Sequence, residues 1–236
     1  PVISGAEDIT INLGDTFNPL NGVKALDSED GDLTSKIVVG SMSRFINPGV
    51  CNVTYVVFDS SNHSASFTRK VRFSDYHAPR FNTSEPLVFT EREGNSTLLK
   101  ERIIANDIID GEISESVINT SSDINYSVAG TYHSTYEVSN SFGDTSTIEL
   151  PVHIIKSENN QIDIKLTQGI IYINTGDTID AADYIESVTS AQGRTLHRVV
   201  KIESNVDNTT PGVYEIHYSA SYSGTNGETW LTVVVQ

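Results

Sequence analysis

The sequence predicts an all-β chain of three tandem β-sandwiches in an elongated array. A strand-like segment with an inward tyrosine occurs three times, so that Tyr55, Tyr136 and Tyr218 lie 81 and 82 residues apart. Units of about 80 residues are long enough to bury a small core of their own. No window shows a sustained apolar period of 3.6 residues, which argues against long helices.

The repeated segment is expected to be the central strand of each sandwich. Its copies are 50–58, 129–138 and 211–220, and each alternates apolar and polar residues. The alternation places the three tyrosines at the centre of each core. Cys51 lies on the same face of its strand, so we expect a buried thiol. It is the single cysteine, which excludes an internal disulfide.

The other strands follow from short alternating runs between turn residues. In the first repeat the expected strands are 9–13, 23–26, 37–40 and 65–73. A turn that begins at Gly14 in the first repeat recurs at Gly94 and Gly176. Pro151 places the strand 145–154 at a sheet edge or a bulge, because proline cannot donate to a ladder. Trp230, the single tryptophan, is expected to pack in a core or between strands.

The repeats set the expected domain boundaries at 1–76, 77–157 and 158–236, with the third domain the most divergent. Pro79 fixes its own φ and holds Ala78 extended, so the first linker should be short and stiff. The second linker, 156–160, has no proline and should bend more easily.

Charge and hydropathy narrow the classes of partner. Fifteen basic residues against 31 acidic ones give a formal charge of −16. Such a chain repels nucleic acid and anionic membrane surfaces, so neither is an expected partner. No run of 18 apolar residues is present, so we expect no membrane insertion in this segment.

Three motifs resemble bacterial immunoglobulin-like tandem repeats of Gram-positive surface proteins, near the internalin, hyalin-repeat and pesticidal-crystal-protein types. They are Pro-Gly-x-Tyr-x-x-x-Tyr in the central strand, Asp30-Gly31-Asp32-Leu33-Thr34 upstream, and Asp75-x-x-Ala78-Pro79 at the junction. The resemblance is close in the first repeat, fair in the second and weak in the third. It implies immunoglobulin-like folds that serve as extracellular stalks, adhesin segments or spacers without catalysis of their own.

The acidic loops are the candidate metal sites. In the first repeat the candidate calcium ligands are Asp27, Glu29, Asp30 and Asp32, and in the second they are Asp107, Asp110 and Glu112. Calcium prefers six to eight oxygen ligands, which carboxylates, carbonyls and water supply. A solvated turn, in which Asp side chains cap backbone amides, explains the same residues. Gly31, Gly111 and Gly193 recur while the charge is lost in the third repeat. The turn is therefore common to all three repeats, and calcium would be confined to the first two.

A second candidate cation site lies at the first junction. Asp75-Tyr76-His77-Ala78-Pro79 is similar to the linkers of cadherins, where calcium stiffens successive domains. Tyr76 and His77 replace the paired Asn and Asp residues of that pattern.

The sequence contains no recognisable catalytic constellation, so we predict that the chain is not an enzyme and requires no cofactor. The six histidines are scattered without metal spacing, and no nucleophile elbow or phosphate loop is present. His133 and His217 are expected to be exposed. An exposed aromatic platform would indicate carbohydrate binding; the tyrosines outside the core pattern are Tyr76, Tyr126, Tyr172, Tyr184 and Tyr222.

Together these features predict a non-catalytic extracellular spacer or adhesion segment of a bacterial cell-surface protein. The alternative is a carbohydrate- or host-protein-binding module that accompanies a secreted enzyme or adhesin. Expected partners are neighbouring domains of a larger surface protein and an unidentified host protein or polysaccharide.

Overall fold

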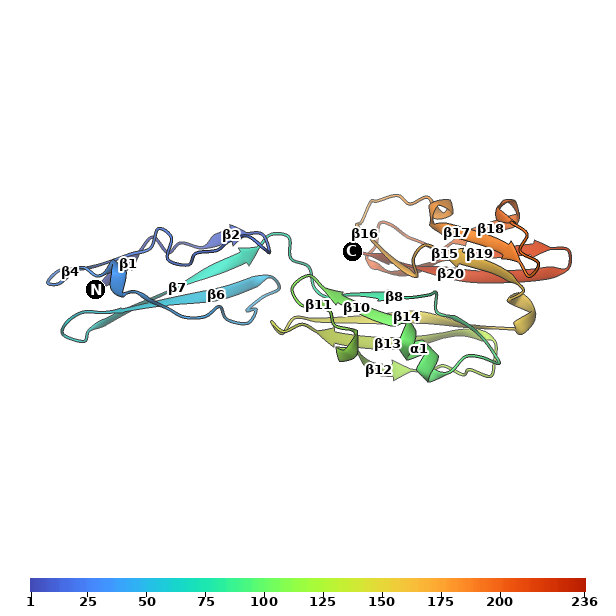
Figure 1. The fold of residues 1–236 in the computed structure, drawn as a ribbon, viewed down its shortest axis with the longest axis horizontal. Coiled ribbons are helices and arrows are strands. Elements are labelled where there is room, and N and C mark those ends of the chain that lie inside the picture. Colours follow the sequence, from blue (N-terminus) through green and yellow to red (C-terminus); the bar gives the residue numbers. More distant parts are fainter. The chain divides into compact units, whose positions relative to one another are not determined.

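The computed structural model describes all 236 residues, and strands dominate it (Figure 1). The all-β prediction is confirmed. By compactness the chain divides into two units. The first consists of residues 1–79, 107–111 and 139–145, and the second of 80–106, 112–138 and 146–236. The boundaries that the repeats suggest, at 76/77 and 157/158, stay a prediction.

Residues 1–79 form two sheets. The elements are β1 (Val2–Ser4), β2 (Ile9–Ile11), β3 (Lys24–Asp27), β4 (Gly31–Asp32), a 3-10 turn (Thr34–Lys36), β5 (Val38–Val39), β6 (Val50–Phe58) and β7 (Ser64–Phe73). One sheet has the order β1-β3-β4 and the other β2-β7-β6-β5. β2 runs parallel to β7, whereas β6 and β7 form an antiparallel hairpin along their whole length. Two sheets face to face are the sandwich expected from the sequence.

The middle repeat has the same plan with one helix added. Its elements are β8 (Arg80–Thr83), β9 (Val88–Thr90), α1 (Ser96–Arg102), β10 (Ile103–Asp107), β11 (Gly111–Glu112), a 3-10 turn (Ser114–Ser116), β12 (Ile118–Ser122), β13 (Gly130–Ser139) and β14 (Thr145–Ile155). The sheets are β11-β10-β8 and β12-β13-β14-β9. The Asn95 side chain caps α1 by accepting from the amides of Thr97 and Leu98. None of the chain's helices has the length and apolar character that crossing a membrane requires.

The third repeat begins after a 3-10 turn at Ser157–Asn159. Its elements are β15 (Ile162–Leu166), β16 (Ile170–Ile173), a 3-10 turn (Ala181–Tyr184), β17 (Ile185–Ser190), a 3-10 turn (His197–Val199), β18 (Val200–Ser204), β19 (Gly212–Tyr222) and β20 (Thr225–Val235). β15 pairs with β17, and the second sheet has the order β16-β20-β19-β18.

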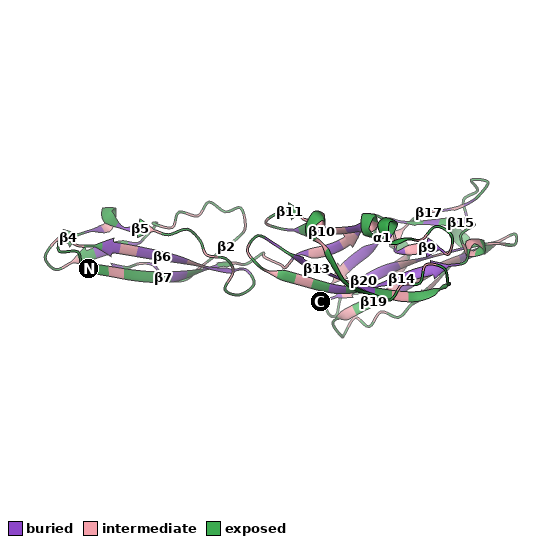
Figure 2. Ribbon diagram, turned by 90° about the horizontal axis from the view of Figure 1, so that it is seen from below, coloured by how far each residue is buried: buried purple, intermediate pink, exposed green.

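Each repeat has its own apolar cluster, which includes the repeated tyrosine. Figure 2 shows the buried positions along the strands. Tyr55 and Tyr218 are fully buried, and Tyr136 is 4% exposed. Cys51 is also buried, as the strand alternation predicts, and burial raises the pKa of its thiol. The central strands β6, β13 and β19 match the predicted segments to within two residues at each end.

Two sequence expectations are wrong. Pro151 predicts an edge or a bulge; the edge is wrong, because β14 is an inner strand between β13 and β9, and the bulge stays a prediction. The parallel ladder with β9 begins at His153, so Pro151 lies before it and interrupts no bond on that side. His217 was expected to be exposed, yet its side chain is only 26% exposed and its ring stacks on Trp230 at 4.3 Å.

Within the second unit, the third repeat packs against the middle one. The Tyr172 hydroxyl accepts from the Phe81 amide (2.9 Å) and donates to the Phe81 carbonyl (3.0 Å). A side chain on Gly169 would collide with Thr83, so only glycine allows this approach of β16 to β8.

An aromatic stack fixes the same interface at a second point. Trp230 lies between two imidazole rings, that of His153 at 3.9 Å and that of His217 at 4.3 Å. His153 Nε2 also lies 2.6 Å from Glu215 Oε1. Trp230 therefore has the inter-strand packing role that the sequence predicts.

Candidate functional site

The first acidic loop follows β3 and holds Asp27 by hydrogen bonds within the loop. Asp27 Oδ1 accepts from the amides of Glu29 (2.9 Å) and Asp30 (3.0 Å), and Oδ2 lies 2.9 Å from the Pro1 amino group. The hydrogen bond from that ammonium, followed by those from the two amides, holds the pKa of Asp27 well below its usual range. This carboxylate therefore closes the turn.

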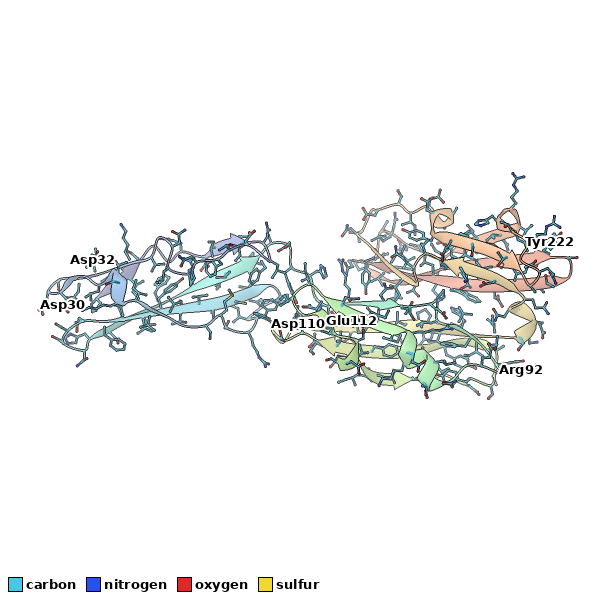
Figure 3. All side chains as sticks on the ribbon, in the orientation of Figure 1. Asp30, Asp32, Arg92, Asp110, Glu112 and Tyr222 are labelled. Atoms are coloured by element: carbon cyan, nitrogen blue, oxygen red, sulfur yellow. The ribbon has the colours of Figure 1, made fainter.

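Asp30 and Asp32 lie on the same loop (Figure 3) but bind different partners. Asp30 accepts from the amide (2.5 Å) and the hydroxyl (2.8 Å) of Ser60, which joins this loop to the β6–β7 turn. Asp32 accepts from the Thr34 amide at 2.9 Å, and hydrogen bonds from Thr34 lower its pKa. Glu29 is exposed. Asp27, Asp30 and Asp32 thus each cap a different group.

The second acidic loop repeats these contacts residue for residue. Asp107 is buried and accepts from two amides of its own loop, at 2.8 and 3.0 Å. Asp110 accepts from the Ser141 amide (2.6 Å) and hydroxyl (2.7 Å), as Asp30 does from Ser60. Glu112 accepts from the Ser114 hydroxyl at 3.0 Å. The repetition shows that the loop is a structural unit of both repeats.

The glycine of each loop has the conformation that the turn requires. Gly31, Gly111 and Gly193 have φ of +73°, +75° and +77°, a region that residues with a Cβ rarely adopt. In the third loop the Ser190 hydroxyl, in place of a carboxylate, accepts from the amides of Gln192 and Arg194. The prediction that glycine serves the turn itself therefore agrees with the structure.

The two acidic loops are also the candidate calcium sites. No group of three or more His, Cys, Asp or Glu side chains in the chain is arranged to hold a metal ion. The contacts of Asp27, Asp30 and Asp32 are those of the capped turn that explains the same residues. Calcium at either loop stays a prediction.

The first junction is tied to the second acidic loop by Tyr76, within the first unit. The Tyr76 hydroxyl donates to Asp144 (2.5 Å) and accepts from the Asn140 amide group (3.0 Å), which also donates to Asp107 (3.2 Å). The Tyr76 ring packs edge-on against Phe45 at 4.7 Å. Burial and then the hydrogen bond to Asp144 raise the pKa of Tyr76. At this junction, hydrogen bonds and aromatic packing hold the linker.

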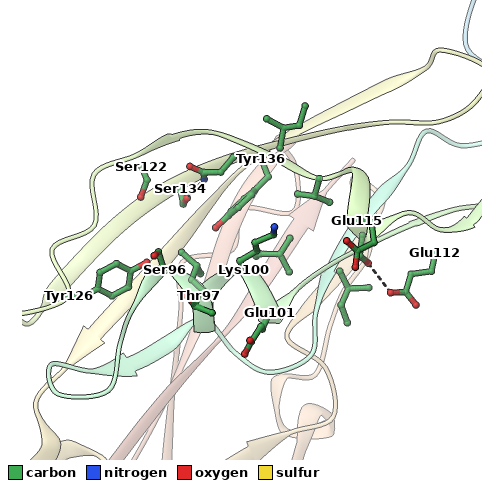
Figure 4. Close-up of a pocket in the computed structure, with 17 residues that line it drawn as sticks. Ser96, Thr97, Lys100, Glu101, Glu112, Glu115, Ser122, Tyr126, Ser134 and Tyr136 are labelled. Atoms are coloured by element: carbon green, nitrogen blue, oxygen red, sulfur yellow. Dashed lines mark hydrogen bonds between the residues drawn. The ribbon is translucent and has the colours of Figure 1, made fainter.

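A groove of about 1100 Å³ opens on the side of the middle repeat, between α1 and β12 (Figure 4). Its apolar wall comes from both sheets and from α1: Leu99, Ile103, Ile104, Val117 and Ile118. Hydroxyl and amide groups make up much of the rest: Ser96, Thr97, Ser114, Asn119, Ser122 and Ser134. Tyr126 lies at one end in Figure 4, and Glu112 and Glu115 lie at the other.

Tyr136, the repeated tyrosine of the middle repeat, lines this groove. In the first and third repeats the matching hydroxyl donates to a backbone carbonyl, from Tyr55 to Pro19 (2.6 Å) and from Tyr218 to Ala181 (2.7 Å). The Tyr136 hydroxyl makes no bond to a carbonyl and lines the groove. Burial raises the pKa of Tyr136, and a hydrogen bond with the side chain of Ser134 works against this rise. One position of the repeat therefore closes two cores and opens onto a groove in the third.

A network of hydrogen bonds lies beside the Tyr136 hydroxyl. The Asn119 amide group donates to the Ser134 hydroxyl at 2.7 Å, and Ser134 donates to the Ser121 carbonyl at 3.3 Å. Burial, followed by the field of Tyr136, raises the pKa of Tyr126. Sequence reasoning did not find this groove; its one signal was Tyr126, a tyrosine outside the core alternation.

The comparisons with known proteins agree with the fold. Residues 1–73 match the family described as bacterial surface protein, Ig-like domain. The resemblance drawn from the sequence motifs is confirmed by this match. The chain is built of immunoglobulin-like β-sandwiches in tandem.

Two curated relatives share longer stretches. The chain is 32% identical over 227 residues to pesticidal crystal protein Cry22Aa of Bacillus thuringiensis, which covers 92% of this chain and 30% of that protein. It is 31% identical over 139 residues to an 81.3 kDa protein of Acholeplasma phage L2, covering 56% of this chain and 18% of that one. The chain thus spans less than a third of either relative.

Among solved structures, similarity is distant. A structure of the CBM51-2 and INT domains of Clostridium perfringens ZmpB, in complex with GlcNAc, matches all of this chain and 41% of that one, with 17% identity and a TM-score of 0.28. The lipoprotein BT2262 of Bacteroides thetaiotaomicron matches 98% of both chains with 11% identity and a TM-score of 0.25. Nothing about a ligand follows from scores this low.

Proposed function

We propose that this chain is a non-catalytic extracellular segment of a bacterial surface protein, in which it spaces and orients neighbouring domains. The observation that carries the proposal is the Tyr76 anchor. A linker whose tyrosine donates to Asp144, accepts from Asn140 and packs on Phe45 has lost much of the freedom of a flexible connection. A spacer needs such a junction because it must hold the next domain at a defined place.

Pulsed electron spin resonance on the whole chain tests this proposal. Spin labels on cysteines introduced at Ser28 and Glu158, in a Cys51→Ala background, should give one narrow distance distribution. Tyr76→Ala should broaden it, because the anchor is lost. The control is Tyr132→Ala, which removes another half-buried tyrosine away from the junction. A wild-type distribution as broad as that of Tyr76→Ala would overturn the spacer function.

A second function, the binding of a carbohydrate or a host protein, is supported by the groove of the middle repeat. A spacer requires only closed cores, as in the first and third repeats. A groove lined by two tyrosines, several hydroxyls and an amide has the mixed character of a ligand site, with apolar walls and a few placed polar groups.

A further inference from the structure

We propose that the groove beside Tyr136 binds a short neutral oligosaccharide. The inference rests on the binding function and is independent of the spacer function. Three features of the groove carry it: a Tyr136 hydroxyl that faces the groove without a carbonyl partner, the combination of aromatic and hydroxyl groups, and the local charge.

The Tyr136 hydroxyl is a polar group of a buried side chain that points into the groove. The residue is 4% exposed, and its counterparts Tyr55 and Tyr218 use the same hydroxyl to bind a carbonyl of their own repeat. In the middle repeat, α1 stands where those covering segments lie, and no carbonyl reaches the hydroxyl. A tyrosine hydroxyl has one donor and two acceptor positions, so beside its hydrogen bond with Ser134 it keeps capacity for a ligand, at the base of a groove large enough for a small molecule.

The lining suits a ligand with apolar faces and hydroxyl edges. Tyr126 presents a half-buried ring at one end of the groove (Figure 4), and Ile103 and Val117 contribute apolar surface. The Asn119 and Ser134 side chains, already joined by a hydrogen bond, offer further donors and acceptors. A sugar ring places C–H groups on its faces and hydroxyls around its rim, which matches this arrangement.

The charge around the groove decides which sugars fit. Three carboxylates, those of Glu101, Glu112 and Glu115, lie around it against the single ammonium of Lys100. The whole chain carries −16. Sialylated, sulfated or phosphorylated glycans would be repelled, whereas a neutral sugar can donate its hydroxyls to the carboxylates.

A peptide strand is the competing ligand, because β12 is the edge of its sheet and all of its residues are exposed. An added strand would pair with the main chain of β12. The added strand would make no contact with the Tyr136 hydroxyl or the Tyr126 ring, because both belong to the interior of the groove. The lining therefore favours the sugar.

Titration calorimetry on the whole chain tests the proposal with maltotriose, cellotriose and N-acetylchitotriose as neutral probes and sialyllactose as the anionic one. We expect at least one neutral trisaccharide to bind with a Kd below about 1 mM and sialyllactose to bind more weakly. Tyr126→Ala should weaken binding about tenfold, and Tyr136→Phe about three- to tenfold. Tyr214→Ala, a half-buried tyrosine of the third repeat, is the matched control and should bind as the wild type does.

Three results would overturn the proposal. One is the failure of every neutral trisaccharide to bind. Another is binding that survives both Tyr126→Ala and Tyr136→Phe. The third is binding of an alternating threonine–valine decapeptide, or of deglycosylated fibronectin, that these variants abolish while no sugar binds. That last result would keep a binding function for the groove and reject the carbohydrate. Unfolding curves of each variant, followed by circular dichroism, separate lost binding from lost structure.

Discussion

The hydroxyl of Tyr218 offers a direct test of how the repeats close their cores. It donates at 2.7 Å to the Ala181 carbonyl from a side chain that is fully buried. Tyr218→Phe keeps the ring and leaves that carbonyl without its donor. An unsatisfied buried acceptor costs about 1–3 kcal/mol, so we expect a loss of about 1.5 kcal/mol in the free energy of unfolding.

Urea unfolding measured by the fluorescence of Trp230 gives this quantity, because Trp230 is the single tryptophan and lies in the same repeat. With a slope of about 2 kcal/mol per molar urea, the midpoint should fall by about 0.7 M at unchanged slope. The control is Tyr214→Phe. The Tyr214 hydroxyl donates to the Thr210 carbonyl at an exposed site, so its removal should lower the free energy of unfolding by less than about 0.5 kcal/mol. Equal midpoints for the two variants would refute the reasoning.

The same substitution in the middle repeat should behave differently. Tyr136→Phe removes a hydroxyl that binds no carbonyl, so circular dichroism should show a smaller loss of stability than for Tyr55→Phe. A larger loss would show that the groove hydroxyl serves the fold.

Three further measurements test particular side chains. Gly169→Ala should lower the free energy of unfolding by about 1–3 kcal/mol, because the new methyl group would collide with Thr83. Thr83→Ala in that background should recover part of the lost stability. An unchanged urea midpoint for Gly169→Ala would contradict this prediction. The pKa of Asp27 is lower in the folded state than in the unfolded state, so its contribution to stability is present above about pH 4 and is lost as the pH falls through the lowered value. The melting temperature of Asp27→Asn should therefore fall less on acidification than that of the wild type. Parallel curves of melting temperature against pH would contradict this prediction. The melting temperature in millimolar calcium, compared with that in EDTA, separates the two interpretations of the acidic loops. A rise that Asp30→Ala/Asp32→Ala abolishes identifies a calcium site, whereas equal values leave capped turns whose carboxylates bind only the hydrogen-bond donors of the chain.

The strands, cores and loops could be predicted because each is encoded by residues close together in the chain. Alternation places Tyr55, Tyr136 and Tyr218 inward, and glycine at positions 31, 111 and 193 permits the left-handed turn. The groove could not be predicted, because it depends on what covers Tyr136 after folding. The covering segments differ in local structure, an irregular loop at Pro19 and a 3-10 turn at Ala181, whereas α1 occupies the middle repeat.

By itself the sequence determined an all-β chain of three repeats, the inward tyrosines and the glycine turns, since strand periodicity and backbone strain are local properties. Only the tertiary structure decided the partners of each polar group. It placed His153 against Trp230, joined Tyr76 to Asn140, and joined Asp30 to Ser60. Such pairings join residues that lie 30 positions or more apart in the chain, and their energies depend on burial and distance, which no local pattern encodes.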